Sequence, residues 1–138
     1  MTNSEKLTQL IVEFYEKLSS WEHSVVRDKG LTLPQMHTLE ILGIHEALRM
    51  KELAEKMGVT TGTLTVMVDR LEKNGMVRRR PHETDRRSIL VELTDAGFEL
   101  FLEHDKLHEQ LTEDITSTLT EAEREGLTAS LKKMNEEF

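Results

Sequence analysis

The stretch that decides the fold runs from Arg49 to Leu93 and reads RMKELAEKMGVTTGTLTVMVDRLEKNGMVRRRPHETDRRSILVEL. Two short helical patterns, expected over 50–57 and 61–74, meet at a turn that contains Gly58. An arginine-rich pair of strands, expected over 77–80 and 88–93, follows at once. A helix–turn–helix followed by a basic hairpin is an arrangement with which small domains bind duplex DNA.

The segments on either side of this stretch are predicted to be helical. Residues 4–26 carry apolar side chains at steps of three and four, and a second helix follows the capping Thr32. A long helix is expected from Thr94 to about residue 118, and a last one opens at Thr120. The predicted fold is therefore mostly α with a small β-wing. Within one compact subunit, a winged helix-turn-helix domain over 31–93 lies between dimerisation helices over 1–30 and 94–138.

The apolar stripes of these end helices exceed what the small central domain can cover. Faces of this kind need a partner, and a second copy of the same chain is the simplest one. The sequence therefore predicts a homodimer.

Charge is unevenly distributed along the chain. The net charge is −8 over 138 residues, but residues 49–93 hold ten Lys/Arg against seven Asp/Glu, and the remainder holds 8 against 19. A locally basic region within an otherwise acidic chain is suited to binding phosphates. The chain has no cysteine, which excludes disulfides and thiolate metal sites. It has no apolar run of the ~18 residues that a membrane span needs. A cytoplasmic protein with no membrane partner is expected.

The expected second helix of the helix–turn–helix begins with small, hydroxyl-bearing residues, which can enter the major groove and touch phosphates or base edges. The hairpin carries arginines on both sides of its loop, and a guanidinium at a hairpin tip fits the minor groove. Asp85 is placed to brace Arg87. A capped surface helix and a solvated charged strand edge are the alternatives. The candidate DNA-binding residues are Thr60, Thr61, Gly62, Thr63, Thr65, Arg70, Arg78, Arg80, Arg86 and Arg87.

Several motifs resemble the MarR family of winged-helix regulators. They are LTLPQMHTLEILG from Leu31, KELAEKMGVTTGTLTVMVDRLEKNGMVRR from Lys51, and DRRSILVELT from Asp85 with Gly97 three residues later. The resemblance implies a DNA-binding transcriptional repressor that binds a palindromic operator as a homodimer. It also implies that the helix over 61–74 reads the major groove and that Arg87 enters the minor groove. A ligand in the cleft between the DNA-binding and dimerisation parts would modulate binding.

His104 and His108 lie four residues apart and therefore share one face of the expected long helix. Neutral imidazoles at this spacing are good zinc ligands, and a carboxylate or a third imidazole would complete a tetrahedron. Glu22, His23 and His37 are the candidates. The ordinary alternative is a pair of histidines that hydrogen-bond within a ligand cleft or a dimer interface.

The set Glu22, His37, His104 and His108 resembles the ligands of the zinc-responsive AdcR/ZitR branch of the family. The first helix needs a gap to align, so Glu22 and His23 are equal candidates for its ligand. The second metal site of that branch uses a cysteine and a glutamate, whereas this chain lacks cysteine and has Met36 at the glutamate position. Zinc is therefore an alternative effector to a small organic molecule.

Two other classes of function fit the sequence less well than a DNA-binding regulator. A metal-dependent hydrolase would need a general base beside an open metal site, and no hydrolase, nucleophile or phosphate-loop motif occurs in the chain. A winged helix used only for protein contacts would not need five arginines on its hairpin. The sequence thus predicts no enzyme. It leaves open the operator, the target genes, the effector and the direction of control.

Overall fold

The structure is a computed structural model that describes residues 1–85 and 87–138. The chain divides into two units, Met1–Phe101 and Leu102–Phe138. The long helix α5 (Asp95–Ile115) begins in the first unit and continues into the second, which also holds α6 (Glu121–Asn135). The other elements of the first unit are α1 (Asn3–Asp28), α2 (Leu33–His45), β1 (Ala47–Arg49), α3 (Met50–Met57), α4 (Thr61–Lys73), β2 (Val77–Pro81) and β3 (Ile89–Leu93).

Threonines begin four of these helices. Thr2, Thr32 and Thr120 each accept a hydrogen bond from the backbone N–H three residues later. The Glu or Gln side chain at that later position accepts one in return from the backbone of the threonine. At α4, Thr60 accepts from the N–H of Thr63. Each such cap is worth about 1 kcal/mol relative to alanine, which explains why the predicted helix starts agree with the observed ones.

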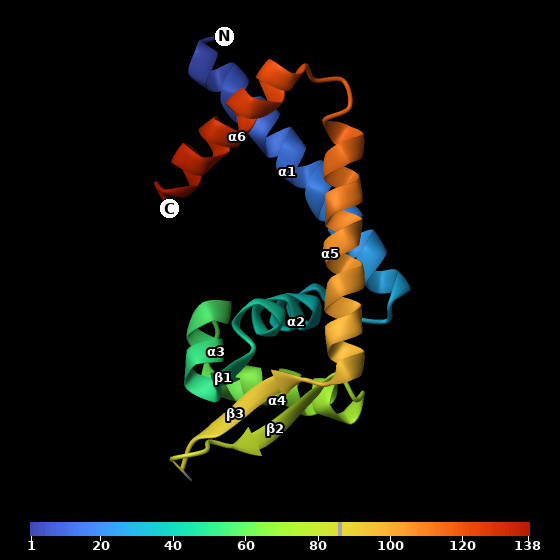
Figure 1. Ribbon diagram of the computed structural model, residues 1–138. Helices are drawn as coiled ribbons and strands as arrows, with labels where there is room; N and C mark the ends of the chain where they lie inside the picture. Colours follow the sequence, from blue (N-terminus) through green and yellow to red (C-terminus); the bar gives the residue numbers. More distant parts are fainter. Residues whose placement is uncertain (86) are drawn as a thin grey trace. The chain divides into compact units, whose positions relative to one another are not determined.

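The three strands form an antiparallel sheet in the order β1–β3–β2. Figure 1 shows α2, α3 and α4 gathered about this sheet and the β2–β3 hairpin projecting beyond them. The sequence predicted the two strands of the hairpin, and in the observed register Val77 pairs with Leu93. It did not predict β1, because three residues with one buried side chain, Leu48, are too short to show strand alternation. The alternation of Ile89, Val91 and Leu93 predicts that all three side chains point inward. Val91 is fully buried, but Ile89 is 40% exposed.

Glycines make two tight features of the first unit possible. Gly58 ends α3 with a positive φ of 69°, a conformation open to glycine without strain, and so makes the turn into α4. A Cβ at Gly97 would collide with the carbonyl oxygen of Met76. Thr94 fixes the same junction, because its hydroxyl donates to the carbonyl of Gly75 at 2.6 Å and accepts from the N–H of Gly97 at 3.1 Å. This geometry accounts for the threonine and glycine of the quoted motif.

The core of the first unit is one apolar cluster that joins α2, α3, α4 and the sheet. Each fully buried aliphatic side chain in it contributes about 1.5–3 kcal/mol. α1 and α6 instead carry large apolar side chains that are exposed in the single chain. None of the helices in the described part of the chain combines the length and apolar character that crossing a lipid bilayer requires. The core residues are Val26, Met36, Leu39, Ile41, Leu42, Leu48, Leu53, Ala54, Leu64, Val68, Leu71, Val77 and Val91.

Candidate DNA-binding surface and histidine pair

The outward face of α4 is built by the spacing of its buried side chains. Leu64, Val68 and Leu71 are fully buried and fix which side of the helix meets the core. The residues predicted to contact DNA lie elsewhere on the helix and at its start, and all of them are exposed. They are Thr60, Thr61, Gly62, Thr63, Thr65 and Arg70.

The threonine hydroxyls at the start of α4 are largely used within the helix. The hydroxyl of Thr60 donates to that of Thr63 at 3.1 Å and accepts from the backbone N–H of Thr63 at 3.2 Å. The hydroxyl of Thr65 donates to the carbonyl of Thr61 at 2.8 Å. Thr60 and Thr65 therefore offer an external partner their methyl groups and oxygen lone pairs rather than a hydroxyl hydrogen.

Arg79 connects the hairpin to α4. Its guanidinium donates to Asp69 at 2.6 Å and to Glu72 at 2.8 Å, and its backbone N–H donates to Glu72 at 3.0 Å. Burial alone would lower the pKa of Arg79, but the hydrogen bonds and charges of Asp69 and Glu72 outweigh it and raise that pKa. The sequence did not predict this contact. Its signal is two acidic residues one turn apart on α4 ahead of an arginine on the next strand.

A third acidic residue pairs with the other two arginines of β2. Glu92 of β3 accepts hydrogen bonds from Arg78 at 3.2 Å and from Arg80 at 2.7 Å, through the same carboxylate oxygen. Arg78 lies directly opposite Glu92 in the sheet register. Five arginines on one hairpin repel one another unless negative charge lies nearby. For these two and for Arg79, the chain itself supplies carboxylates.

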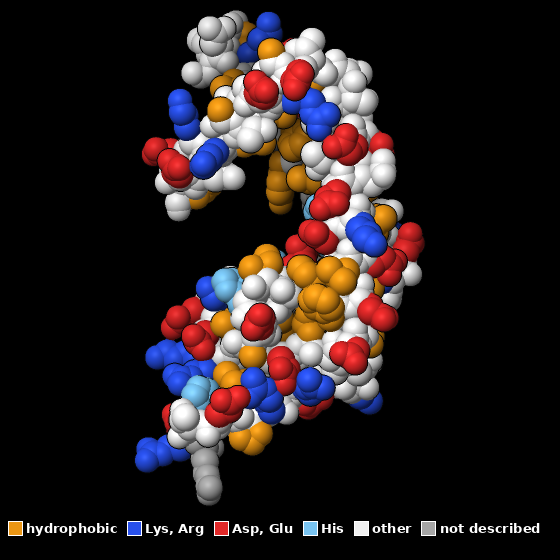
Figure 2. All heavy atoms as spheres, viewed as in Figure 1, with side chains coloured by type: hydrophobic (Ala, Val, Ile, Leu, Met, Phe, Trp, Pro, Cys, Tyr) orange, Lys and Arg blue, Asp and Glu red, His pale blue; other side chains and the backbone are white. Residues whose placement is uncertain are grey.

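The loop of the hairpin is held by Asp85. Its carboxylate accepts from the backbone N–H of Arg87 at 3.1 Å and from the hydroxyl of Ser88 at 3.0 Å. These two hydrogen bonds, the backbone one first, lower the pKa of Asp85. In the structure, Asp85 therefore holds Arg87 through the backbone N–H of Arg87. Arg87 is exposed, and the predicted contact Arg86 lies outside the described residues. Figure 2 shows Lys and Arg side chains interspersed with Asp and Glu over this part of the first unit.

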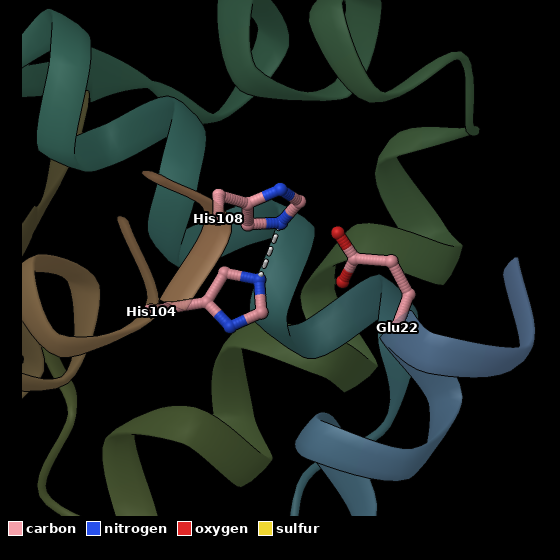
Figure 3. Close-up of side chains that lie close together, drawn as sticks. All are labelled: Glu22, His104 and His108. Atoms are coloured by element: carbon pink, nitrogen blue, oxygen red, sulfur yellow. Dashed lines mark hydrogen bonds between the residues drawn. The ribbon is translucent and has the colours of Figure 1, made fainter. Parts of the chain in front are cut away.

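The two histidines of α5 are brought together. The Nε2 atoms of His104 and His108 lie 3.1 Å apart, and their rings meet edge to face at 74° (Figure 3). One Nε2 donates to the other, so both nitrogens point into the same space, as ligands of one cation would. His104 is buried and His108 is half-buried.

The other predicted ligands belong to the first unit. Glu22, labelled in Figure 3, comes from α1 and is half-buried. His37 is exposed on α2. His23 is exposed on α1, where its Nδ1 donates to the carbonyl of Ser19 at 2.8 Å, so that nitrogen already has a partner within its own helix.

The helix–turn–helix α3–α4, followed by the β2–β3 hairpin of a three-stranded sheet, defines the winged helix-turn-helix class. Residues 31–89 match the model of the MarR family. Residues 31–89 therefore form a MarR-family winged helix-turn-helix domain, and the relatives that match this part of the chain are transcriptional regulators.

Individual relatives agree with the family. An uncharacterised transcriptional regulator of Bacillus subtilis, YfiV, is 42% identical over 71 residues, which are 51% of this chain and 44% of that protein. The organic hydroperoxide resistance regulator of the same organism is 40% identical over 68 residues, 49% of this chain and 46% of the relative. The chain thus matches less than half the length of these two relatives.

The fold is also found among solved structures. FabT of Streptococcus pneumoniae, solved in complex with DNA, aligns with a TM-score of 0.88 at 22% identity and covers 97% of this chain and 96% of its own. At that identity the likeness shows the fold alone.

Proposed function

We propose that the chain is a DNA-binding transcriptional repressor that binds a palindromic operator as a homodimer. The observation that carries the proposal is the Arg79 contact, because it joins an exposed helix and a basic hairpin into one DNA-binding surface. In the proposal α4 enters the major groove and the hairpin tip enters the minor groove. The contacts are assigned to Thr60, Thr61, Gly62, Thr63, Thr65, Arg70, Arg78, Arg80, Arg86 and Arg87, with Asp85 bracing Arg87.

The homodimer is supported by apolar faces that the single chain leaves open. On α1, Leu7 and Phe14 are exposed, the latter by 54%, and α6 has no buried residue. Leu131 and Phe138 belong to the exposed apolar set of the C-terminal region. Exposed apolar faces on two separate helices support packing against a second copy of the chain. Access to the chromosome places such a regulator in the cytoplasm.

DNA binding is tested by the salt dependence of affinity for random-sequence duplex. Each phosphate contact contributes about −0.9 to the slope of log affinity against log salt, so a clearly negative slope is expected. Arg87→Ala should weaken binding and reduce the slope by about one per subunit. Arg27→Ala, which removes an exposed arginine from α1, is the matched control and should change neither. A flat slope, or equal behaviour of the two variants, would favour a winged helix used for protein contacts.

Modulation by an effector between the DNA-binding and dimerisation parts is the second half of the proposal. A small organic molecule is one candidate. Zinc is the other, and the observation that favours it is the 3.1 Å approach of His104 and His108. We assign Glu22 and His37 as the remaining ligands, since two imidazoles, a carboxylate and a third imidazole form a donor set that zinc accepts.

Metal analysis of the purified chain and zinc titration test this assignment. Stoichiometric zinc is expected, with loss of binding in His104→Ala and in His108→Ala but not in His45→Ala, which removes a histidine from the end of α2. The affinity of the chain for selected duplexes should then differ between samples with and without a chelator. No stoichiometric zinc, together with unchanged DNA binding in His104→Ala, would leave the organic effector as the remaining candidate.

A further inference from the structure

Val66 stands out on the exposed side of α4. The buried residues Leu64, Val68 and Leu71 define the inward direction of the helix. At 100° per residue, Gly62 and Val66 then fall on the opposite, outermost line. Val66 is 53% exposed there. Single exposed apolar residues are common and need no explanation in themselves, so the inference depends on what surrounds this one.

The first two turns of α4 contain no side chain suited to bidentate base recognition. Residues 61–68 include no Asn, Gln, Lys or Arg, the residues that pair with adenine or guanine edges. The next residue, Asp69, is held by Arg79 at 2.6 Å. The hydroxyl hydrogen of Thr65 is bound to the carbonyl of Thr61. What remains on this face is methyl groups, the lone pairs of threonine oxygens and the bare Cα of Gly62.

We propose that Val66, with the close approach allowed by Gly62, reads the C5 methyl group of thymine in each operator half-site. Thymine is the base that presents an apolar group in the major groove, so it is the partner that two valine methyls fit best. A Cβ at Gly62 would meet only the hydroxyl oxygen of Thr60, at 3.9 Å, so the space beside Val66 is open for a base edge. This inference rests on the proposed DNA binding and makes Val66 a specificity-determining residue.

A double-mutant cycle between protein and DNA tests the contact. Duplexes that the chain binds are first selected from a random-sequence pool, and each thymine is then replaced by deoxyuridine, which lacks only the C5 methyl. Burial of one methyl group corresponds to about a fourfold change in affinity. We therefore expect about a fourfold loss at one thymine position in each half-site, and roughly a 15-fold loss when both are replaced.

The variant Val66→Ala should bind the thymine duplex more weakly and show no further loss with deoxyuridine at that position. Alanine favours helix more than valine, so this change leaves α4 folded. Val66→Thr keeps one methyl group and should retain part of the discrimination.

The inference is overturned if no deoxyuridine substitution changes affinity by more than about twofold, or if Val66→Ala discriminates as the unaltered chain does. Failure of the proposed DNA binding has a different signature, because no duplex would then be enriched in the selection.

Discussion

The outward face of α4 and the outer face of the wing sheet belong to one candidate surface but differ in charge. α4 has no charged side chain between Thr61 and Val68. The sheet presents Arg78 and Arg80, both bonded to Glu92. Under the proposed function, the difference implies a division of roles in which the helix offers shape and methyl groups to the bases. The wing would offer positive charge to the phosphates, and its own carboxylate would limit that charge.

The largest effect is expected from breaking the connection between the two regions. Arg79→Ala leaves Asp69 and Glu72 facing each other without their shared cation, so the free energy of unfolding should fall by about 1–2 kcal/mol. Arg79 is only 26% exposed, whereas both partners are more open, which keeps the expected loss in this range. Urea unfolding measures the effect. Lys17→Ala, which breaks the exposed pair with Glu13, is the control and should leave the unfolding midpoint nearly unchanged.

A second change sharpens the contrast by raising the charge of the wing. Glu92→Gln keeps an oxygen acceptor but removes the negative charge, so Arg78 and Arg80 become available to phosphates. Affinity for random-sequence duplex at low salt should rise about tenfold, and the salt slope should steepen by up to about two per subunit. Fluorescence anisotropy over a salt series measures both. An unchanged slope would mean that these two arginines do not reach the DNA backbone.

The loop of the wing should respond to acid. The pKa of Asp85 is lowered by the backbone N–H of Arg87 and the hydroxyl of Ser88, so ionised Asp85 stabilises the loop. That contribution is fully present above the ordinary pKa of aspartate and is lost as pH falls through the lowered value. The amide resonance of Arg87, followed by NMR from neutral to acidic pH, should report the transition. In Asp85→Asn an acceptor remains but does not titrate, so a surviving transition would assign the effect to another group.

The smallest effect is expected on the helix. Thr65→Val keeps the outline of the side chain and removes a hydroxyl whose hydrogen already serves the carbonyl of Thr61. Affinity for selected duplexes should therefore change by less than about twofold. A loss of tenfold or more would show that the oxygen of Thr65 accepts a bond from a base and that the helix does not read by methyl groups alone.

Much of the fold was predictable because its signals are local. The capping threonines, Gly58 and the apolar spacing of α4 act within one or two turns, and the structure reproduces the elements expected from them. β1 was missed because its pairing with β3 joins residues more than 40 positions apart and leaves no periodic trace in three residues. The pairing of Arg79 with α4 and of Glu92 with β2 was missed for another reason: it depends on which face of the helix and of the sheet each side chain occupies, and charge alone does not show that.

The residues of the candidate site were predictable from the sequence, but the hydrogen bonds that they make within the chain were not. The sequence singled out the threonines of α4 and the arginines of the hairpin, and the structure places the described ones on exposed or half-exposed surface. Sequence patterns could not show which hydroxyls and guanidiniums are already bonded within the chain. Because the hydroxyl hydrogens of Thr60 and Thr65 are used within the chain, the exposed Val66 becomes a candidate for base contact.

Under the proposed function, the Arg79 contact has a consequence for the rate at which DNA is bound. Because Asp69 and Glu72 hold the strand that leads into the hairpin, the helix and the wing are oriented relative to each other before any duplex is met. The conformational entropy of aligning them is lost during folding and not during association, so the chain is preorganised for its partner. Association is then governed by diffusion and by the long-range field of the basic stretch, and differences among duplexes are expressed mainly in how long each complex survives.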